Sequence, residues 1–226
     1  MDYTVEVLKE GYSRMEKGKM IANGTSTLIR GKGANILVDT LSPWDKEFLI
    51  EALKVRGLSC DDIQYVVGTH GHIDHIGNLN LFKKATHIVG FSVCQGDQYY
   101  IHPFEMNMPY VINDKIEVIP TPGHTGTDVS VVVRTEDKGV VAIVGDLFEK
   151  EDDLLNEQIW KHEAGSEHPK LQLYNRNKIL RKAHYIIPGH GPMFQVREEM
   201  RPKMPEEVKD EDDELGSSAF SNLKNE

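Results

Sequence analysis

The sequence predicts an α/β protein, because short apolar runs typical of strands alternate with amphipathic helical segments along most of its 226 residues. A second observation is that residues able to bind metal recur where predicted strands end. His70, Asp146 and His190 each follow such a run. At 39% hydrophobic residues the chain can bury a full core, and its length favours a single domain. We therefore expect one α/β domain that carries a polar site at the ends of its strands.

The first part of the chain predicts a strand meander followed by a helix. Strands are expected at 3–8, 19–30, 34–39 and 63–67, where apolar residues alternate or cluster, with a glycine turn at 31–33. Ser42 or Asp45 is a candidate cap for a helix that Gly57 ends. A further helix is expected from Ile76 to Phe82, directly after a histidine-rich segment.

The remainder predicts more strands and one long helix. Strands are expected at 87–90, 110–112, 116–119, 130–133, 140–144 and 185–187, and a helix at 171–183. The segment 149–170 is polar and irregular. Its Trp160 is expected either to line a substrate cleft or to cover the core.

The sequence His-Gly-His-Ile-Asp-His at 70–75 is the strongest functional signal. Imidazole nitrogen and carboxylate oxygen suit zinc and other first-row metals. In an extended loop, positions i and i+2 point the same way, so His70 and His72 can hold one ion. Asp74 and His75 lie where the chain turns into a helix, so they can point at a second ion.

Three later residues complete a candidate ligand set. His124 follows Pro-Gly, Asp146 follows the glycine at the end of an apolar strand, and His190 stands in Pro-Gly-His-Gly. Taken alone each signal is weak, since a Gly-Asp pair is more often a turn and a single histidine is usually a surface or core residue. Their order after the histidine-rich motif gives seven candidate ligands.

Composition narrows the class of protein. Cys60 and Cys94 are too few and too isolated for a disulfide framework or a cysteine metal site. The net charge is −10, and residues 197–226 hold 10 acidic and 5 basic residues. We expect a domain over 1–196 and an acidic, disordered tail over 197–226. The N-terminus has no signal core and no run is long enough to span a membrane, which predicts an intracellular, soluble protein.

Four motifs together resemble the metallo-β-lactamase superfamily, in particular its glyoxalase II-like branch. They are Thr-His-Gly-His-Ile-Asp-His at 69–75, Thr-Pro-Gly-His-Thr at 121–125, Gly-Asp-Leu-Phe at 145–148 and Pro-Gly-His-Gly at 188–191. The resemblance covers residues 20–192 and implies a four-layer αββα sandwich with the site at one edge.

The resemblance also implies a role for each ligand. The first metal would be held by His70, His72 and His124, and the second by Asp74, His75 and His190. Asp146 would bridge the two ions, Asp74 would act as the proton acceptor, and Asp39 would support the site from behind. Two divalent ions are implied, zinc first, with iron or manganese as alternatives.

At closer range the resemblance implies an endoribonuclease that processes the 3′ ends of histone pre-mRNA. It would act on RNA as a homodimer in the cytosol and nucleus, without a membrane partner. Two alternatives stay open: a thioesterase of the glyoxalase II type, which shares all seven ligands, and an iron-dependent persulfide dioxygenase, which uses two histidines and the aspartate. Metal content separates them, because two ions favour hydrolysis and one iron favours oxidation.

Overall fold

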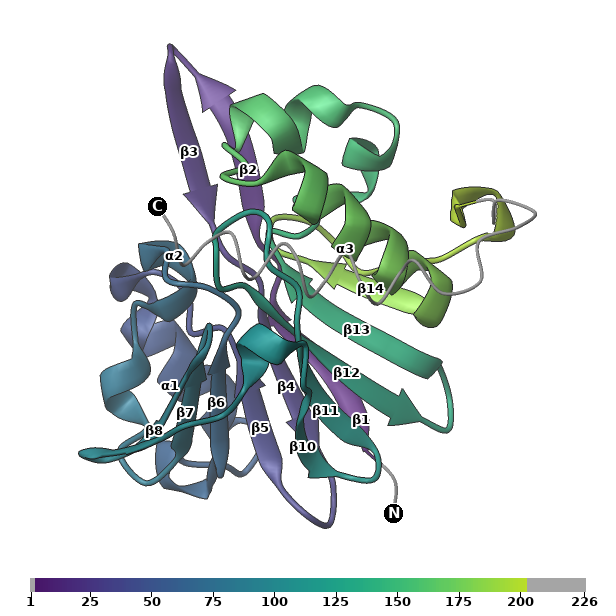
Figure 1. The fold of residues 1–226 in the computed structure, drawn as a ribbon. Coiled ribbons are helices and arrows are strands. Elements are labelled where there is room, and N and C mark those ends of the chain that lie inside the picture. The colour runs from purple at the N-terminus through teal and green to yellow at the C-terminus, as the bar shows by residue number, and fades with distance from the viewer. Residues whose placement is uncertain (1–2, 203–226) are drawn as a thin grey trace.

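The computed structural model describes residues 3–202, which form two β-sheets, a separate hairpin and outer helices (Figure 1). The first sheet has the order β1 (Thr4–Lys9), β4 (Ser26–Arg30), β5 (Asn35–Val38), β6 (Tyr65–Gly68), β7 (Thr86–Val89), β8 (Ser92–Gln95) and β9 (Gln98–Tyr100). The second has the order β10 (Tyr110–Asn113), β11 (Ile116–Pro120), β12 (Val129–Thr135), β13 (Gly139–Gly145), β14 (Tyr185–Pro188) and β15 (Phe194–Gln195). The hairpin pairs β2 (Tyr12–Glu16) with β3 (Lys19–Asn23), and the α-helices are α1 (Lys46–Lys54), α2 (Ile73–Ile76) and α3 (Pro169–Lys182).

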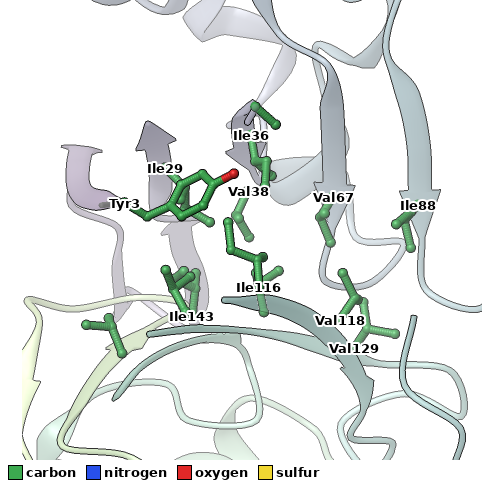
Figure 2. Packing of buried hydrophobic residues seen from close by; sticks show 14 of the residues in the cluster. Tyr3, Ile29, Ile36, Val38, Val67, Ile88, Ile116, Val118, Val129 and Ile143 are labelled. Carbon is green, nitrogen blue, oxygen red and sulfur yellow. The ribbon is translucent and has the colours of Figure 1, made fainter. Parts of the chain in front are cut away.

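The two sheets pack face to face over the largest apolar cluster, where Val38 and Val67 of the first sheet meet Val118 and Ile143 of the second (Figure 2). Helix α1 buries Leu53 against the outer face of the first sheet. Helix α3 lies across the outer face of the second sheet, as Figure 1 shows. The predicted four-layer αββα sandwich is therefore confirmed.

Strand β12 illustrates why apolar residues are continuous in the middle of this fold. Val129, Val131 and Val133 point into the cluster between the sheets, and Val132 points into the cluster under α3. Successive side chains of a strand face opposite sides, so a central strand covered on both faces needs apolar residues at every position.

Two expected elements are wrong in their limits. The single strand expected at 19–30 is broken into β3 and β4, and β3 leaves the sheet to pair with β2. The helix expected from Ile76 to Phe82 is replaced by α2, which begins at Ile73, and a 3₁₀ turn at Leu79–Leu81. The break lies at Gly77, where a Cβ atom would lie 2.4 Å from the Pro43 nitrogen. Close contact with the preceding loop therefore ends α2 early.

The segment 149–170 is folded onto the body although its sequence is polar. It contains a 3₁₀ turn at Glu151–Leu154 and a π-helical turn at Ile159–Glu163. Trp160 is buried, and the Arg176 guanidinium lies over its ring, so this residue covers the core. Arg176 also forms a buried ion pair with Asp153, which fixes the segment on α3.

The C-terminal end of the described chain stays close to α3. The guanidinium of Arg201 donates hydrogen bonds to the carbonyls of Leu180 and Ala183. The rest of the acidic segment expected to be disordered, residues 203–226, lies outside the described residues, so the boundary at 196 stays a prediction. Between residues 3 and 202, none of the helices combines the length and the apolar character needed to cross a membrane.

Candidate metal centre

The candidate ligands converge at one edge of the sandwich, because strands from both sheets end there. Strand β6 runs into the loop that holds His70 and His72, and β11 runs into the loop that holds His124. In the second sheet, Asp146 follows β13 and His190 follows β14, which pair in parallel. The carboxyl ends of parallel strands meet at the same edge of a sheet, which explains why distant motifs share one site.

One group of ligands consists of three histidines. His70 Nε2 lies 2.8 Å from His72 Nδ1, and His124 Nε2 lies 3.1 Å from the same Nδ1 atom. The rings meet edge to face, with centroids 4.5 to 4.9 Å apart. The three nitrogens thus present their lone pairs to a single point, which is the donor set that zinc prefers.

A second group consists of Asp74, His75 and His190. Asp74 Oδ2 lies 3.9 Å from His75 Nε2 and 3.8 Å from His190 Nε2. Asp74 and His75 reach this point because α2 begins at Ile73 and turns both side chains away from the extended loop. Two nitrogens and a carboxylate oxygen form a second pocket able to hold a divalent cation.

Asp146 lies between the two groups. Its Oδ1 atom is 3.2 Å from His75 Nε2, and its Oδ2 atom is 3.2 Å from His190 Nε2 and 3.4 Å from His124 Nε2. Two buried atoms that face this space, His75 Nε2 and Asp146 Oδ1, have no hydrogen-bond partner. Unpaired buried polar atoms are costly, so these two fit ligands whose partner is a cation.

Asp39 supports this arrangement from behind, as the resemblance implied. Its Oδ2 atom accepts a hydrogen bond from His75 Nδ1 at 2.7 Å, and its two oxygens also accept from the Thr69 backbone N–H and hydroxyl. This fixes the tautomer of His75 and leaves Nε2 free to face the site. Asp39 itself has a φ of +57°, a left-handed conformation that aspartate tolerates better than most residues.

Gly189 and His190, at the end of β14, are both placed by close contacts at the site. A Cβ atom on Gly189 would lie 1.9 Å from Asp146 Oδ1, so only glycine fits beside this carboxylate. His190, the next residue, is held by a 3.0 Å hydrogen bond between its Nδ1 and the carbonyl oxygen of Asn23 at the end of β3. The hairpin therefore positions a ligand that comes from the opposite end of the chain.

The metal-free site is strongly polarised. Burial and repulsion from His75 hold the pKa of His70 well below its usual value. Burial lowers the pKa of His190 as well, but attraction to Asp146 outweighs it and raises that pKa to about 9. Burial opposes ionisation of Asp146, yet attraction to His190 and His75 holds its pKa well below the usual range. A permanently ionised carboxylate among histidines is a strong attractor for cations.

Sequence reasoning missed Glu149. Its side chain is only 2% exposed, Oε2 lies 3.9 Å from His190 Nε2, and Oε1 has no hydrogen-bond partner. Ser13 of β2 donates a 3.3 Å hydrogen bond to Oε2. Burial and repulsion from Asp146 raise the pKa of Glu149 to about 8. Its position three residues after Asp146 was the one available signal.

A cavity of about 230 Å³ opens over the two groups. Its lining includes five of the seven candidate ligands together with side chains of the β2–β3 hairpin and the 149–170 segment: Ser13, Met20, Ala22, His72, Asp74, His124, Asp146, Glu149, Glu163, Ala164 and His190. Figure 1 shows the hairpin standing beside the helical turns of that segment, above the sandwich. All seven predicted residues thus come together beside a cavity that can admit a substrate.

Comparison with known proteins identifies the family of this chain. A sequence profile of the metallo-beta-lactamase superfamily matches residues 22–114. The chain is 42% identical to metallo-beta-lactamase domain-containing protein 1 of Xenopus laevis, over 86% of this chain and 82% of that one. It is 39% identical to the human protein of the same name, over 89% of this chain and 85% of the relative.

Solved structures show the same fold. An N-acyl homoserine lactone hydrolase, with a product bound at its catalytic metal centre, superimposes with a TM-score of 0.61 at 18% identity. The match covers 84% of this chain and 92% of that structure. Given the identity to the Xenopus relative over most of both chains, this chain belongs to the metallo-beta-lactamase superfamily, as a metal-dependent hydrolase.

Proposed function

We propose that this chain is a dinuclear, zinc-dependent endoribonuclease that hydrolyses phosphodiester bonds of single-stranded RNA. The observation that carries the proposal is the pair of ligand groups that flank Asp146 beneath one open cavity. Two adjacent ions suit in-line displacement at phosphorus, because one side can hold the attacking oxygen and the other the leaving oxygen. The processing of histone pre-mRNA is the specific substrate that the sequence resemblance implies.

The donor sets fit two divalent ions, three imidazoles on one side and two imidazoles with a carboxylate on the other. When bound, such ions supply the Lewis-acid chemistry that activates water and offsets negative charge on the substrate. His70, His72 and His124 would hold one ion and Asp74, His75 and His190 the other, with the Asp146 carboxylate between the two groups. Metal content separates this function from a persulfide dioxygenase, because two ions per chain favour hydrolysis and a single iron favours oxidation.

Asp74 is the proposed proton acceptor. Its side chain is 23% exposed and lines the cavity, whereas Asp146 is nearly enclosed. One of its oxygens, Oδ2, faces His75 and His190, which lets the other receive a proton from the cavity. A carboxylate within reach of the attacking group can act as general base.

The test offers single-stranded RNA and a glutathione thioester to the same zinc-loaded enzyme. We expect RNA cleavage and a sharp loss of it in Asp74→Asn, with Asp137→Asn as the matched control because Asp137 is exposed in a turn far from the site. Rapid thioester turnover with intact RNA would overturn the ribonuclease in favour of the glyoxalase II-type thioesterase. Since the body is acidic, binding should depend only weakly on salt.

Assembly and location are part of the same proposal. Sheet β1–β9 ends at the β9 edge, where Tyr99 and the following Ile101 expose large apolar side chains, as a self-associating surface would. We propose a homodimer, present in the cytosol and nucleus. Light scattering on the purified chain tests the dimer, and a monomer at working concentration would contradict it.

A further inference from the structure

A second cavity adjoins the one over the metal centre. It also measures about 230 Å³, and the two share Ser13, Met20, Glu149, Glu163 and Ala164 in their linings. The outer cavity lies between hairpin β2–β3 and the π-helical turn at Ile159–Glu163. A substrate that crosses the metal centre can therefore continue directly into it.

Two cations line the outer cavity and neither lines the inner one. They are Arg14 of β2 and Lys150, which follows Glu149. The polar partner of Lys150 Nζ is the carbonyl oxygen of Ser13 at 3.5 Å, and Lys150 belongs to none of the ion pairs found among residues 3–202. Arg14 contacts Glu16 at 3.6 Å in an exposed pair, which contributes little and is easily exchanged.

We propose that Arg14 and Lys150 bind a backbone phosphate of the substrate next to the phosphodiester held at the metal centre. The inference rests on the proposed function. The contact would make the site prefer a polynucleotide over a molecule with a single phosphodiester. An ammonium and a guanidinium are the side chains that recognise phosphate, one as a point charge and the other as a planar fork.

Acidic residues lie between the two cavities and restrict where a phosphate can bind. Glu149 and Glu163 line both cavities, so the passage between the metal centre and the cations carries carboxyl groups. The exposed Glu163 carboxylate disfavours an anion in that passage, whereas the two cations of the outer cavity favour one beyond it. Apolar Met20 lies at the same passage and suits a ribose or base rather than a phosphate. A polyanion with spaced charges fits this alternation.

The test measures equilibrium binding of a 2′-O-methyl RNA trinucleotide to the full-length, zinc-loaded enzyme by calorimetry. We expect Lys150→Met and Arg14→Met each to weaken binding about tenfold, the usual effect of losing a charged hydrogen bond. Lys150→Arg should restore most of the affinity. Lys17→Met is the matched control, because Lys17 lies in the turn of the same hairpin but lines neither cavity.

A trinucleotide with neutral methylphosphonate linkages provides the second arm. It should bind the native enzyme and Lys150→Met equally weakly. Equal binding of charged and neutral trinucleotides, or native affinity in Lys150→Met, would overturn the proposal. So would S-methylglutathione binding that depends on Lys150 when trinucleotide binding does not, since the anion would then be a carboxylate. If the native enzyme leaves RNA intact but binds the trinucleotide through Lys150, the ribonuclease fails and the phosphate site stands.

Discussion

The two halves of the metal centre are built differently. The half formed by His70, His72 and His124 is all imidazole, and His72 is exposed at the cavity. The half formed by Asp74, His75 and His190 has a carboxylate in place of the third imidazole. The motif at 70–75 supplies ligands to both halves. The two halves therefore differ in the contacts that surround each ligand side chain.

The surroundings favour rigidity in the second half. His75 is held by the Asp39 carboxylate at 2.7 Å, and His190 by the carbonyl of Asn23 at 3.0 Å. In the first half, His70 Nδ1 contacts the Thr69 hydroxyl at 3.1 Å, but His124 Nδ1 is buried without a hydrogen-bond partner. Ligands held by outer partners bind metal more tightly, because they are already oriented and lose less conformational freedom on binding. We therefore expect the second half to retain its ion longer than the first.

The largest effect should come from Asp146, which both halves share. Asp146→Ala removes the ionised carboxylate from between the two groups, so more than one equivalent of metal should be lost after dialysis. Metal analysis by mass spectrometry measures this directly. A variant that still bound two ions with native affinity would remove Asp146 from the site.

The variants His75→Ala and His72→Ala test whether a ligand histidine also stabilises the folded protein. In metal-free protein, the pKa of His75 is raised well above its usual value, because attraction to Asp146 and Asp39 outweighs burial. His75→Ala leaves the Asp39 carboxylate buried without that cation, which costs about 3 kcal/mol of unfolding free energy. His72→Ala should change stability little, since His72 is exposed. Urea unfolding of both apoproteins checks this, and equal destabilisation would contradict the contrast.

Asp39→Asn tests the outer partner alone. The amide keeps the shape of Asp39 but loses the charge that orients His75, so affinity of the second half for zinc should fall about 10- to 100-fold. Competition with a chromogenic chelator measures it. If zinc binds in two steps and Asp39→Asn lowers only the affinity of the first half, Asp39 is not the partner that orients His75.

The smallest effect is a pH dependence. In the metal-free protein the pKa of His190 is about 9, against 6.5 for a free histidine. A raised pKa stabilises the folded state fully below pH 6.5 and loses that contribution as pH rises through 9. Zinc needs the neutral ring, so its affinity rises over the same interval. The difference in Tm between loaded and metal-free protein should therefore grow from pH 6.5 to 9.

Thermal unfolding at several pH values measures that difference. His102→Gln serves as the control, because the His102 ring bonds the Met108 carbonyl, away from both halves. A difference in Tm that stayed constant across the interval would show that His190 does not control metal binding.

The sequence predicted which residues meet better than it predicted how the chain delivers them. His124, Asp146 and His190 were identified because each follows a glycine at a strand end, a local signal. The end of α2 at Ile76 could not be foreseen, because Gly77 ends the helix through contact with a loop 34 residues earlier.

The hairpin and Glu149 escaped prediction for a similar reason. Alternating residues at 19–30 fit one strand equally well. Contacts with distant segments separate β3 from β4: Asn23 bonds His190 and Ser42, and the Thr25 N–H donates to the Gly189 carbonyl. Glu149 ends the Gly-Asp-Leu-Phe-Glu run at 145–149, which does not by itself indicate that its side chain is buried beside the site. Its burial depends on Ser13, which is 136 residues away, so it follows from the fold alone.

The bond between Asn23 and His190 makes the hairpin part of the metal centre. Any ligand that shifts β3 must also shift the carbonyl that holds a metal-facing ring. Linkage then requires the reverse: an ion bound through His190 must change the affinity of the hairpin for that ligand by the same factor. Substrate capture and metal retention are therefore expected to be thermodynamically coupled quantities in this enzyme.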